Sequence, residues 1–466
     1  MNFCNTRIKT RISAWVQAIT CIVVWQRPES TELPEATTKG PTLLYGQASS
    51  MLLPIPLANL ALFFSNKLFP VHVAQHPHVR PPSNALNFHL RHFHVATSSA
   101  NVYLSDVPHD FSPASSLSSV LLSIPTSPLR TTRPSSHDHF LAARHVSKRG
   151  QSAMLDWQED EVPGPDVTRR ETLLQLAKMT SNTYFEPGSS GWYNLTDEWN
   201  LGMPVGWEPD DDGFRGYVFA TEDNSTVVLT IKGTSIPIVG GGPTIEKDKL
   251  NDNLLFSCCC ARVSRTWTPV CDCYRGGWKC NEECVEDALI DESLFYPTGV
   301  NLYNNVTTMY PNANIWVIGH SLGGALASLL GITFGAPVVT FEPPGERMAA
   351  QRLHLPSPPS THHITHVWHT ADPIAMGTCT GSLSTCGIAG YAMESRCHLG
   401  NIIEYDTITN LSWSARLTTH GIATVIDSIL SKPWPAAEEQ GLEVPAFKRQ
   451  DDCVDCFQWE YGNFTL

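Results

Sequence analysis

Residues 315–324 read Ile-Trp-Val-Ile-Gly-His-Ser-Leu-Gly-Gly, and this stretch decides the fold. Its first four residues are β-branched or aromatic, which predicts a buried strand, while the small and apolar residues 322–330 predict a helix that packs closely on a sheet. Between them lies the pattern G-x-S-x-G of a nucleophile elbow, in which a serine occupies a sharp strand-to-helix turn and the flanking glycines avoid Cβ clashes. Ser321 is therefore the predicted nucleophile.

A serine nucleophile needs a base and an acid that orients the base, and in α/β-hydrolases these follow it in the order acid, then histidine. Downstream of the elbow, residues 338–341 and 364–369 predict two further strands, and the second ends just before Asp372. Open α/β sheets place functional side chains at the carboxyl ends of their strands, which favours Asp372 as the acid. His420 precedes residues 422–430, whose apolar positions have helical spacing, so it lies on the loop that enters a last helix.

Several other residues are candidates for these two roles. Asp406 and Asp427 are alternative acids, and a histidine chosen at random is more often a surface or core residue than a catalyst. Position in the predicted secondary structure separates them, because Asp427 falls within a helix and only Asp372 and His420 fall on loops after sheet strands. The alternative bases are His362, His363, His366, His369 and His398.

A tetrahedral intermediate also needs amide donors for its oxyanion. The N–H of Leu322, directly after the nucleophile, is the first expected donor. The second should follow an earlier strand, and residues 226–232 are the clearest upstream strand signal, ending at Gly233-Thr234-Ser235. Thr234 is the candidate second donor, with an ordinary turn at 233–235 as the alternative.

Four short segments, taken together, carry a resemblance to a known family. They are Lys232-Gly233-Thr234-Ser235, Gly319-His320-Ser321-Leu322-Gly323-Gly324, His369-Thr370-Ala371-Asp372-Pro373 and Thr419-His420-Gly421. In this order they resemble the oxyanion loop, elbow, acid and histidine of the class 3 fungal lipases. Residues 157–165, 251–260, 390–395 and 453–460 make the chain similar to the autophagy-related lipases within that family, from about residue 150 to the end.

That resemblance implies an α/β-hydrolase fold, with a mostly parallel central sheet flanked by helices and a Cys-rich insert. It further implies a phospholipase or triacylglycerol lipase that hydrolyses membrane glycerolipid esters, phosphatidylserine among them, and needs no cofactor or metal. Such a protein would travel as a single-pass type II membrane protein through the endoplasmic reticulum, the Golgi and multivesicular bodies. It would reach the vacuole, where autophagic bodies are broken down.

Composition sets independent bounds on the partners and the compartment. A net charge of −14 and a pI near 5.7 argue against nucleic acid as a partner, and the sequence does not indicate an oligomeric state. Twelve of the fourteen cysteines lie from Cys258 onward. Together with five sequons, they indicate an oxidising secretory compartment. The sequon asparagines are Asn194, Asn224, Asn305, Asn410 and Asn463.

Disulfides are the favoured state of these cysteines, although a zinc site in the insert 256–284 is an alternative, and the pairing cannot be deduced. The insert lies between the oxyanion strand and the elbow, where lipases of this kind carry a lid. We therefore expect a disulfide-linked surface loop near the mouth of the site, with Trp267, Trp278 and residues 254–256 as possible lipid contacts.

The predicted domain organisation has four parts. Residues 1–70 form a signal or anchor region with apolar runs at 12–25 and 51–64, and Met51 is a candidate true start. Residues 71–155, rich in Ser, Pro and His, are expected to be a largely disordered lumenal stem. Residues 156–435 form the hydrolase domain, which opens with a helix over 171–184 capped by Thr168, and residues 436–466 form a tail with a C-x-x-C motif.

Three classes of function are compatible with the sequence. The first is a membrane-lipid hydrolase, which the resemblance favours. The second is a hydrolase of soluble esters, which would share the elbow and the triad but would need no membrane anchor. The third is a non-catalytic lipid-binding protein that has kept the fold, against which the apparent set of Ser321, Asp372 and His420 argues.

Overall fold

The computed structural model describes residues 84–97, 102–106, 122–148, 154–185, 191–193, 211–235, 244–260, 269–292 and 295–464. The chain divides into two compact units, residues 1–76 and 77–466, and all described residues belong to the second. The apolar runs at 12–25 and 51–64, together with Asn194 and Trp267, lie outside the described residues. Within the described ranges no helix is both long enough and apolar enough to cross a bilayer.

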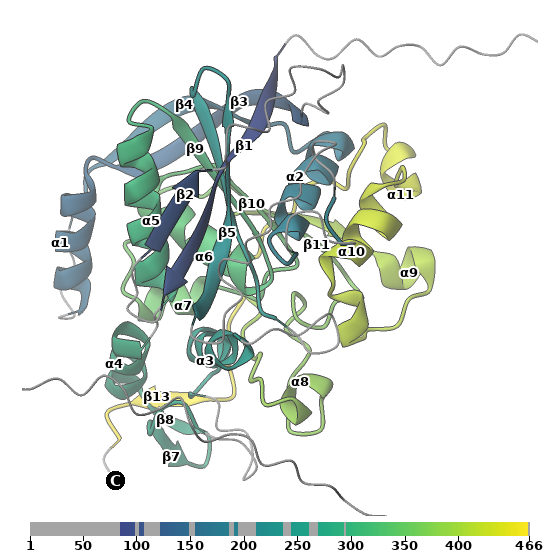
Figure 1. Ribbon diagram of the computed structural model, residues 1–466. Coiled ribbons are helices and arrows are strands. Elements are labelled where there is room, and N and C mark those ends of the chain that lie inside the picture. The colour runs from purple at the N-terminus through teal and green to yellow at the C-terminus, as the bar shows by residue number, and fades with distance from the viewer. Residues whose placement is uncertain are drawn as a thin grey trace, which may run out of the picture. The chain divides into compact units, whose positions relative to one another are not determined.

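A single ten-stranded sheet forms the centre of the second unit (Figure 1). From β12 to β6 the neighbouring strands are parallel, and from β5 onward they are antiparallel. The predicted α/β-hydrolase fold is therefore confirmed, with a mixed sheet that is parallel in the half that carries the elbow. In spatial order the strands are β12 (Asn401–Tyr405), β11 (Ile364–His369), β10 (Val338–Phe341), β9 (Asn314–His320), β6 (Thr226–Ile231), β5 (Asp211–Thr221), β1 (Ala85–Thr97), β3 (Leu122–Pro134) and β4 (Trp157–Pro165), with β2 (Val102–Asp106) beside β1.

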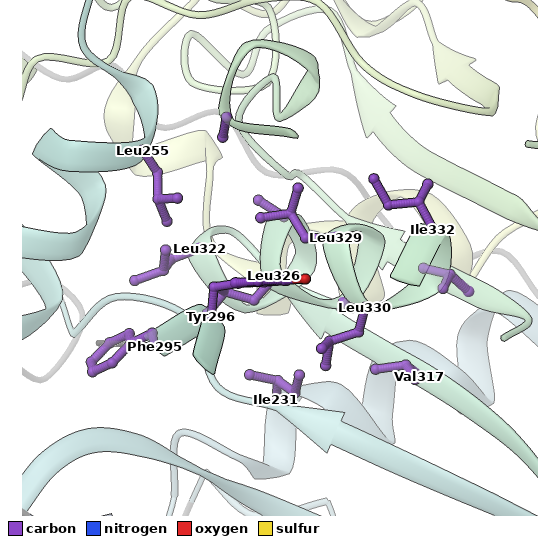
Figure 2. Packing of buried hydrophobic residues seen from close by; sticks show 14 of the residues in the cluster. Ile231, Leu255, Phe295, Tyr296, Val317, Leu322, Leu326, Leu329, Leu330 and Ile332 are labelled. Carbon is purple, nitrogen blue, oxygen red and sulfur yellow. The ribbon is translucent and has the colours of Figure 1, made fainter. Parts of the chain in front are cut away.

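Helices cover both faces of this sheet because its central strands are apolar on both sides. In β9, Ile315 and Val317 face one core cluster while Trp316 and Ile318 face the other. The first cluster includes residues of α1 (His137–Lys148), α3 (Ile245–Phe256), α4 (Glu282–Glu292), α5 (Phe295–Met309), α6 (Leu322–Phe334) and α7 (Arg347–Arg352). The second includes residues of α2 (Arg170–Asn182), α10 (Ile422–Thr424), the π-helical turn Val425–Leu430 and α11 (Pro435–Glu438). Figure 2 shows the apolar side chains of α6 packed among those of α3, α5, β6 and β9.

The expected disordered stem over residues 71–155 is wrong for much of its length, since β1, β2, β3 and α1 lie within it. Phe88, Leu122 and Ile124 are core residues there, and β1 lies between β5 and β3. The prolines of β3 misled the sequence analysis. Pro128 and Pro134 lie where β3 pairs only with β4, so a missing amide hydrogen leaves no partner unsatisfied. Two of the three β1 histidines, His92 and His94, are also buried, and the ring of His94 donates a hydrogen bond to the carbonyl of Thr230 at 2.8 Å.

The twelve cysteines from Cys258 onward form six disulfides, so the favoured disulfide state is confirmed. Two of them, Cys258–Cys456 and Cys397–Cys453, join the C-terminal tail to the rest of the unit. The tail also supplies β13 (Glu460–Gly462), which pairs with β8 (Lys279–Asn281) beside β7 (Tyr274–Gly276). The remaining pairs are Cys259–Cys280, Cys260–Cys271, Cys273–Cys284 and Cys379–Cys386.

The expected lipid contact of residues 254–256 is wrong. Leu254, Leu255 and Phe256 end α3 and are at most 2% exposed, because this helix turns its last residues into the first core cluster. Figure 2 shows Leu255 among the side chains around α6. Trp278 differs, since it is 53% exposed on the turn between β7 and β8.

The predicted helix over 171–184 is present as α2, but its predicted cap is wrong. The helix begins at Arg170 with Arg169 in the capping position and no side-chain cap. The hydroxyl of Thr168 instead donates a hydrogen bond to the carboxylate of Asp166 at 2.5 Å. The Thr168 hydroxyl is thus used within the preceding turn and does not cap the helix. The first amides of α2 are left to other acceptors, and the N–H of Arg170 donates to the carboxylate of Glu443.

The elbow glycines are required by close approach of backbone to backbone. A Cβ on Gly319 would lie 2.3 Å from the carbonyl oxygen of Gly323. A Cβ on Gly323 would lie 2.3 Å from the carbonyl oxygen of Ile231 and 2.6 Å from that of Lys232. Real Cβ atoms do not approach backbone so closely, so the start of α6 packs against the end of β6 only because residue 323 has no side chain.

Replacing Phe88 tests whether β1 belongs to the folded domain. Phe88 is 2% exposed and its ring lies 5.4 Å from that of Trp316, so Phe88→Ala should lower the free energy of unfolding by about 3 kcal/mol. Urea denaturation followed by tryptophan fluorescence, with the disulfides intact, measures this. The control is Tyr103→Ala on β2, a 57% exposed side chain, whose loss should change stability by about 0.5 kcal/mol or less. Equal stability of the two variants would contradict the placement of β1.

Replacing Gly323 tests the close approach at the elbow. In Gly323→Ala the new methyl group must push the end of β6 away, which should lower stability by about 1–3 kcal/mol and slow the reaction of Ser321 with a fluorophosphonate. Thermal unfolding and the labelling rate measure the two effects. Gly421→Ala is the matched control, because its nearest neighbour lies 4.0 Å away and its φ is −65°. A Gly323→Ala protein as stable and reactive as this control would refute the packing described.

Candidate active site

Ser321 lies between β9 and α6 with a strained backbone, at φ 56° and ψ −129°. A side chain rarely adopts this conformation, and it persists only where the surrounding structure enforces it. Here the N–H of Ser321 donates to the carbonyl of Phe341 at 3.0 Å, and its carbonyl accepts from the N–H of Ala325 at 3.1 Å. The strand on one side and the helix on the other thus hold the side chain at the apex of the turn.

The three residues predicted as a triad lie together. The Nε2 atom of His420 is 2.8 Å from the Oγ atom of Ser321, and its Nδ1 atom is 2.8 Å from Oδ2 of Asp372. A carboxylate accepts the Nδ1–H, which leaves Nε2 to accept the hydroxyl proton. All three side chains are at most 4% exposed, so neither hydrogen bond is exposed to competition from bulk water.

Asp372 is held in its charged form by its surroundings. Burial by itself would raise the pKa of Asp372, but attraction to His420 and hydrogen bonds from His420, Glu342 and the N–H of Ile374 together hold it below its usual range. The hydrogen bond from Ile374 measures 2.9 Å. The acid therefore stays ionised in acidic surroundings and keeps orienting the imidazole.

The alternative acids and bases have other partners. Asp406 caps α9 (Thr407–Leu411) by accepting from the N–H of Thr409, and Asp427 accepts a long hydrogen bond from Tyr193. None of the alternative histidines forms a hydrogen bond with Ser321 in the described structure. His363 bonds to Gly331, His366 to Thr340, His369 to Thr407 and Thr419, His398 to Pro343 and Gln450, and His362 is exposed.

His320 and Tyr184 support the base from behind, and sequence analysis missed both roles. The Nε2–H of His320 donates to the carbonyl of His420 at 2.9 Å, and its Nδ1 lies 2.6 Å from the hydroxyl of Tyr184. Burial, with repulsion from His420, lowers the pKa of His320 to about 3, so this histidine stays neutral and fixes the backbone of His420. The only available signal was its place inside the elbow motif.

The candidate oxyanion loop abuts the elbow. A Cβ on Gly233 would lie 2.3 Å from the carbonyl oxygen of His320 and 3.0 Å from Cβ of Ser321. Gly233 therefore packs directly against the elbow, and Thr234 is the next residue along the chain. Leu322 begins α6, where helix amides lack intrahelical acceptors. Both predicted donor residues are therefore close to Ser321 along the chain or in space: Leu322 follows it directly, and Thr234 follows Gly233, which packs against the elbow.

A buried polar cluster fixes this loop from below. The Thr234 hydroxyl donates to Asp252 at 2.6 Å, and the N–H of Ser235 donates to Asp248 at 2.8 Å. Lys232 forms an ion pair with Asp248 at 3.0 Å, and both side chains are at most 1% exposed. Burial raises the pKa of Asp252 well above its usual value and lowers that of Lys232 to about 8. Because its hydroxyl is used in this way, Thr234 is left with its backbone N–H for an oxyanion.

A second buried carboxyl group lies beside Asp372. Glu342 directly follows β10, is 0% exposed and has a left-handed backbone with φ 47°. Its side chain accepts from the N–H of His369 at 3.1 Å and is hydrogen-bonded to the carboxyl group of Asp372. Glu342 was not among the predicted site residues, although its position at the carboxyl end of a parallel strand is the same signal that favoured Asp372.

Four of the five sequon asparagines are described, and all four are exposed. They are Asn224, Asn305, Asn410 and Asn463. Exposure is a requirement for carrying a glycan, so these positions remain candidates. The sulfur atoms of Cys260, Cys271 and Cys273 lie within 4.8 Å of one another, but each is already in a disulfide.

Comparison with known proteins relates the chain to one family. Residues 298–378 match the family of class 3 lipases. The ATG15 protein of Cryptococcus neoformans, whose name describes it as a lipase, is 50% identical in an alignment 368 residues long. The alignment covers 66% of this chain and 71% of that protein. The protein of the same name from Kluyveromyces lactis is 46% identical over 339 residues, covering 70% of this chain and 62% of that one.

Solved structures show a more distant likeness. The Lip2 lipase of Yarrowia lipolytica is 17% identical, and the match covers 50% of this chain and 78% of that chain with a TM-score of 0.27. The relationship to the ATG15 proteins therefore rests on sequence identity, with the elbow, acid and histidine in their expected order along the chain. The chain belongs to the ATG15 lipases, a family of class 3 lipases.

Proposed function

We propose that this lipase is a serine carboxylic-ester hydrolase that acts on membrane glycerolipids through Ser321, His420 and Asp372. The hydrogen-bonded chain from Ser321 Oγ through His420 to Asp372 carries the proposal, with both links at 2.8 Å. No metal or cofactor has a part in this chemistry, because the imidazole supplies the base and backbone amides supply the electrostatic stabilisation.

In the first half of the reaction, Oγ of Ser321 attacks the ester carbonyl carbon while Nε2 of His420 takes the hydroxyl proton. The carbonyl oxygen becomes an oxyanion, which accepts hydrogen bonds from the backbone N–H groups of Leu322 and Thr234. The intermediate then expels the alcohol, and His420 returns the proton to that oxygen as the carbon–oxygen bond breaks. The acyl group remains on Ser321.

In the second half, water replaces the alcohol. His420 takes a proton from water, hydroxide attacks the acyl carbon, and the collapse of the second intermediate releases the fatty acid and restores the serine. Asp372 remains a carboxylate throughout and stabilises the imidazolium formed in each half. The anchored position of the loop at Gly233 means that the oxyanion donors need not reorganise during the reaction.

The substrates we propose are phospholipids, phosphatidylserine among them, and triacylglycerols. Membership of the ATG15 lipases supports a role in degrading autophagic bodies and multivesicular-body membranes within the vacuole. Six disulfides and four exposed sequon asparagines support passage through the endoplasmic reticulum and Golgi. A single-pass type II membrane anchor in the N-terminal region completes the proposal.

Replacing the nucleophile tests this function directly. Ser321→Ala should lower turnover of phosphatidylserine vesicles and triolein emulsions by at least about 10³-fold, because the acyl-enzyme cannot form. Fatty-acid release by purified protein measures the loss. Ser414→Ala, an exposed serine six residues before His420, is the control and should keep full activity.

Two results would contradict the proposal in different ways. Unchanged lipid release by Ser321→Ala would favour the non-catalytic lipid-binding function. Loss of short, water-soluble ester hydrolysis in Ser321→Ala, with no wild-type activity on vesicles or emulsions, would keep the triad but favour the soluble-ester hydrolase.

A further inference from the structure

We propose that Glu342 is a positioning residue for the catalytic acid, which keeps its own proton and donates it in a hydrogen bond to the carboxylate of Asp372. This inference rests on the proposed function, since it assigns a task to a group that acts through Asp372 and His420. Glu342 touches neither the nucleophile nor the oxyanion donors in the hydrogen bonds described above.

The backbone around Glu342 is built to turn its side chain toward the triad. Its N–H donates to the carbonyl of Val367 at 2.9 Å, which extends the pairing of β10 with β11 by one residue. Its left-handed φ of 47° then ends the strand, a conformation that costs energy in a residue other than glycine. The side chain is fully buried, so its carboxyl group must find partners within the protein.

Three ionisable groups face this carboxyl group from the elements around it. Asp372 follows β11 and shares a hydrogen bond with it, His369 ends β11 with its Nε2 atom 3.7 Å away, and His420 lies beyond Asp372. His369 is neutral, because its Nε2–H donates to the carbonyl of Thr419 at 3.0 Å and burial lowers its pKa. Within the described part of the chain, His420 is the one potential cation that acts on these two carboxyl groups.

Two adjacent buried carboxyl groups cannot both be ionised without strong repulsion, so one of them holds a proton. Asp372 is the carboxyl group that is ionised, since it binds the imidazole of His420 at 2.8 Å and accepts a hydrogen bond from the N–H of Ile374 at 2.9 Å. Glu342 accepts one amide hydrogen, from His369. Burial and the neighbouring Asp372 both raise the pKa of Glu342, whereas the hydrogen bond from Glu342 lowers that of Asp372.

The consequence concerns the pH at which the base works. A carboxylate attracts a proton onto the imidazole beside it, and a protonated His420 cannot accept the serine hydroxyl. A hydrogen bond donated by Glu342 spreads the charge of Asp372 over a third partner and weakens that attraction. It also fixes the plane of the carboxylate, so that Oδ2 stays directed at His420. Loss of this hydrogen bond should therefore favour protonation of the base, and a pH profile of activity measures that effect.

The test compares two replacements of similar size in the full chain. Glu342→Gln keeps a hydrogen-bond donor but cannot ionise, and Glu342→Leu has no donor. We measure kcat/KM for a soluble short-chain ester from pH 4 to 9, together with the rate of fluorophosphonate labelling of Ser321. In Glu342→Leu the acid limb of both profiles should move up by about one pH unit, so that activity at pH 5 falls about ten-fold further than at pH 8. In Glu342→Gln the limb should stay where it is.

Other outcomes would overturn the proposal. If Glu342 were ionised in the wild type, Glu342→Gln would remove a negative charge and move the acid limb to lower pH. A Glu342→Leu protein with an unshifted limb would show that Glu342 fills space only. Glu346→Gln is the control for damage to a buried carboxyl group, since Glu346 is equally buried but is paired with His366, and it should leave the limb unmoved.

A spectroscopic measurement separates this inference from the proposed function. Infrared difference spectra of wild type against Glu342→Gln at pH 6 should contain the C=O stretch of a protonated carboxylic acid, whether or not the protein hydrolyses any ester. A protein that shows this band yet keeps ester turnover after Ser321→Ala would refute the hydrolase mechanism and leave the protonated Glu342 in place. Absence of the band would refute the role of Glu342 alone.

Discussion

The contact between Gly323 and the carbonyl of Ile231 is the constraint on which the site depends. Because no side chain separates them, the first turn of α6 lies directly against the end of β6. The nucleophile and the candidate oxyanion loop, which are almost ninety residues apart in sequence, are thereby held at one place. The strain at Ser321 is tolerated because strand, helix and neighbouring strand β10 all hold its backbone.

Around that contact the protein buries many polar groups, and some of them are paired with a specific partner. Lys232 is paired with Asp248 behind the oxyanion loop, and Glu346 with His366 behind the elbow helix. Such pairs add little net stability, because desolvation cancels most of the attraction, but removal of one partner leaves an uncompensated buried charge. Their effect is to fix geometry. The hydrogen bond from Thr234 to Asp252 and the pair of Lys232 with Asp248 hold the oxyanion loop. The pair of Glu346 with His366 holds the segment after β10.

Much of this site is predictable from the sequence because it depends on local patterns. The elbow requires glycines at fixed spacing, Asp372 follows a predicted strand, and His420 lies just before a predicted helix, so all three can be located from local patterns. Disulfide pairing depends on which chain segments meet, and no spacing rule gives Cys258–Cys456. The strands β1 and β3 were missed because buried histidines and edge prolines imitate a polar linker. Tyr184 and Glu342 act through tertiary contacts that a linear pattern does not contain.

The buried histidines give the fold a defined response to acid. Burial lowers the pKa of His94 and His363 to about 4 and that of His320 to about 3. An unfolded chain binds protons at these residues below about pH 6.5 and the folded chain does not, so stability falls as pH drops from 6.5 toward 4. Glu346, with a pKa lowered from 4.5 to about 2, keeps its contribution down to about pH 4.5 and loses it gradually below. In acidic surroundings a fold of this kind needs a compensating constraint, and six disulfides supply one by restricting the unfolded chain.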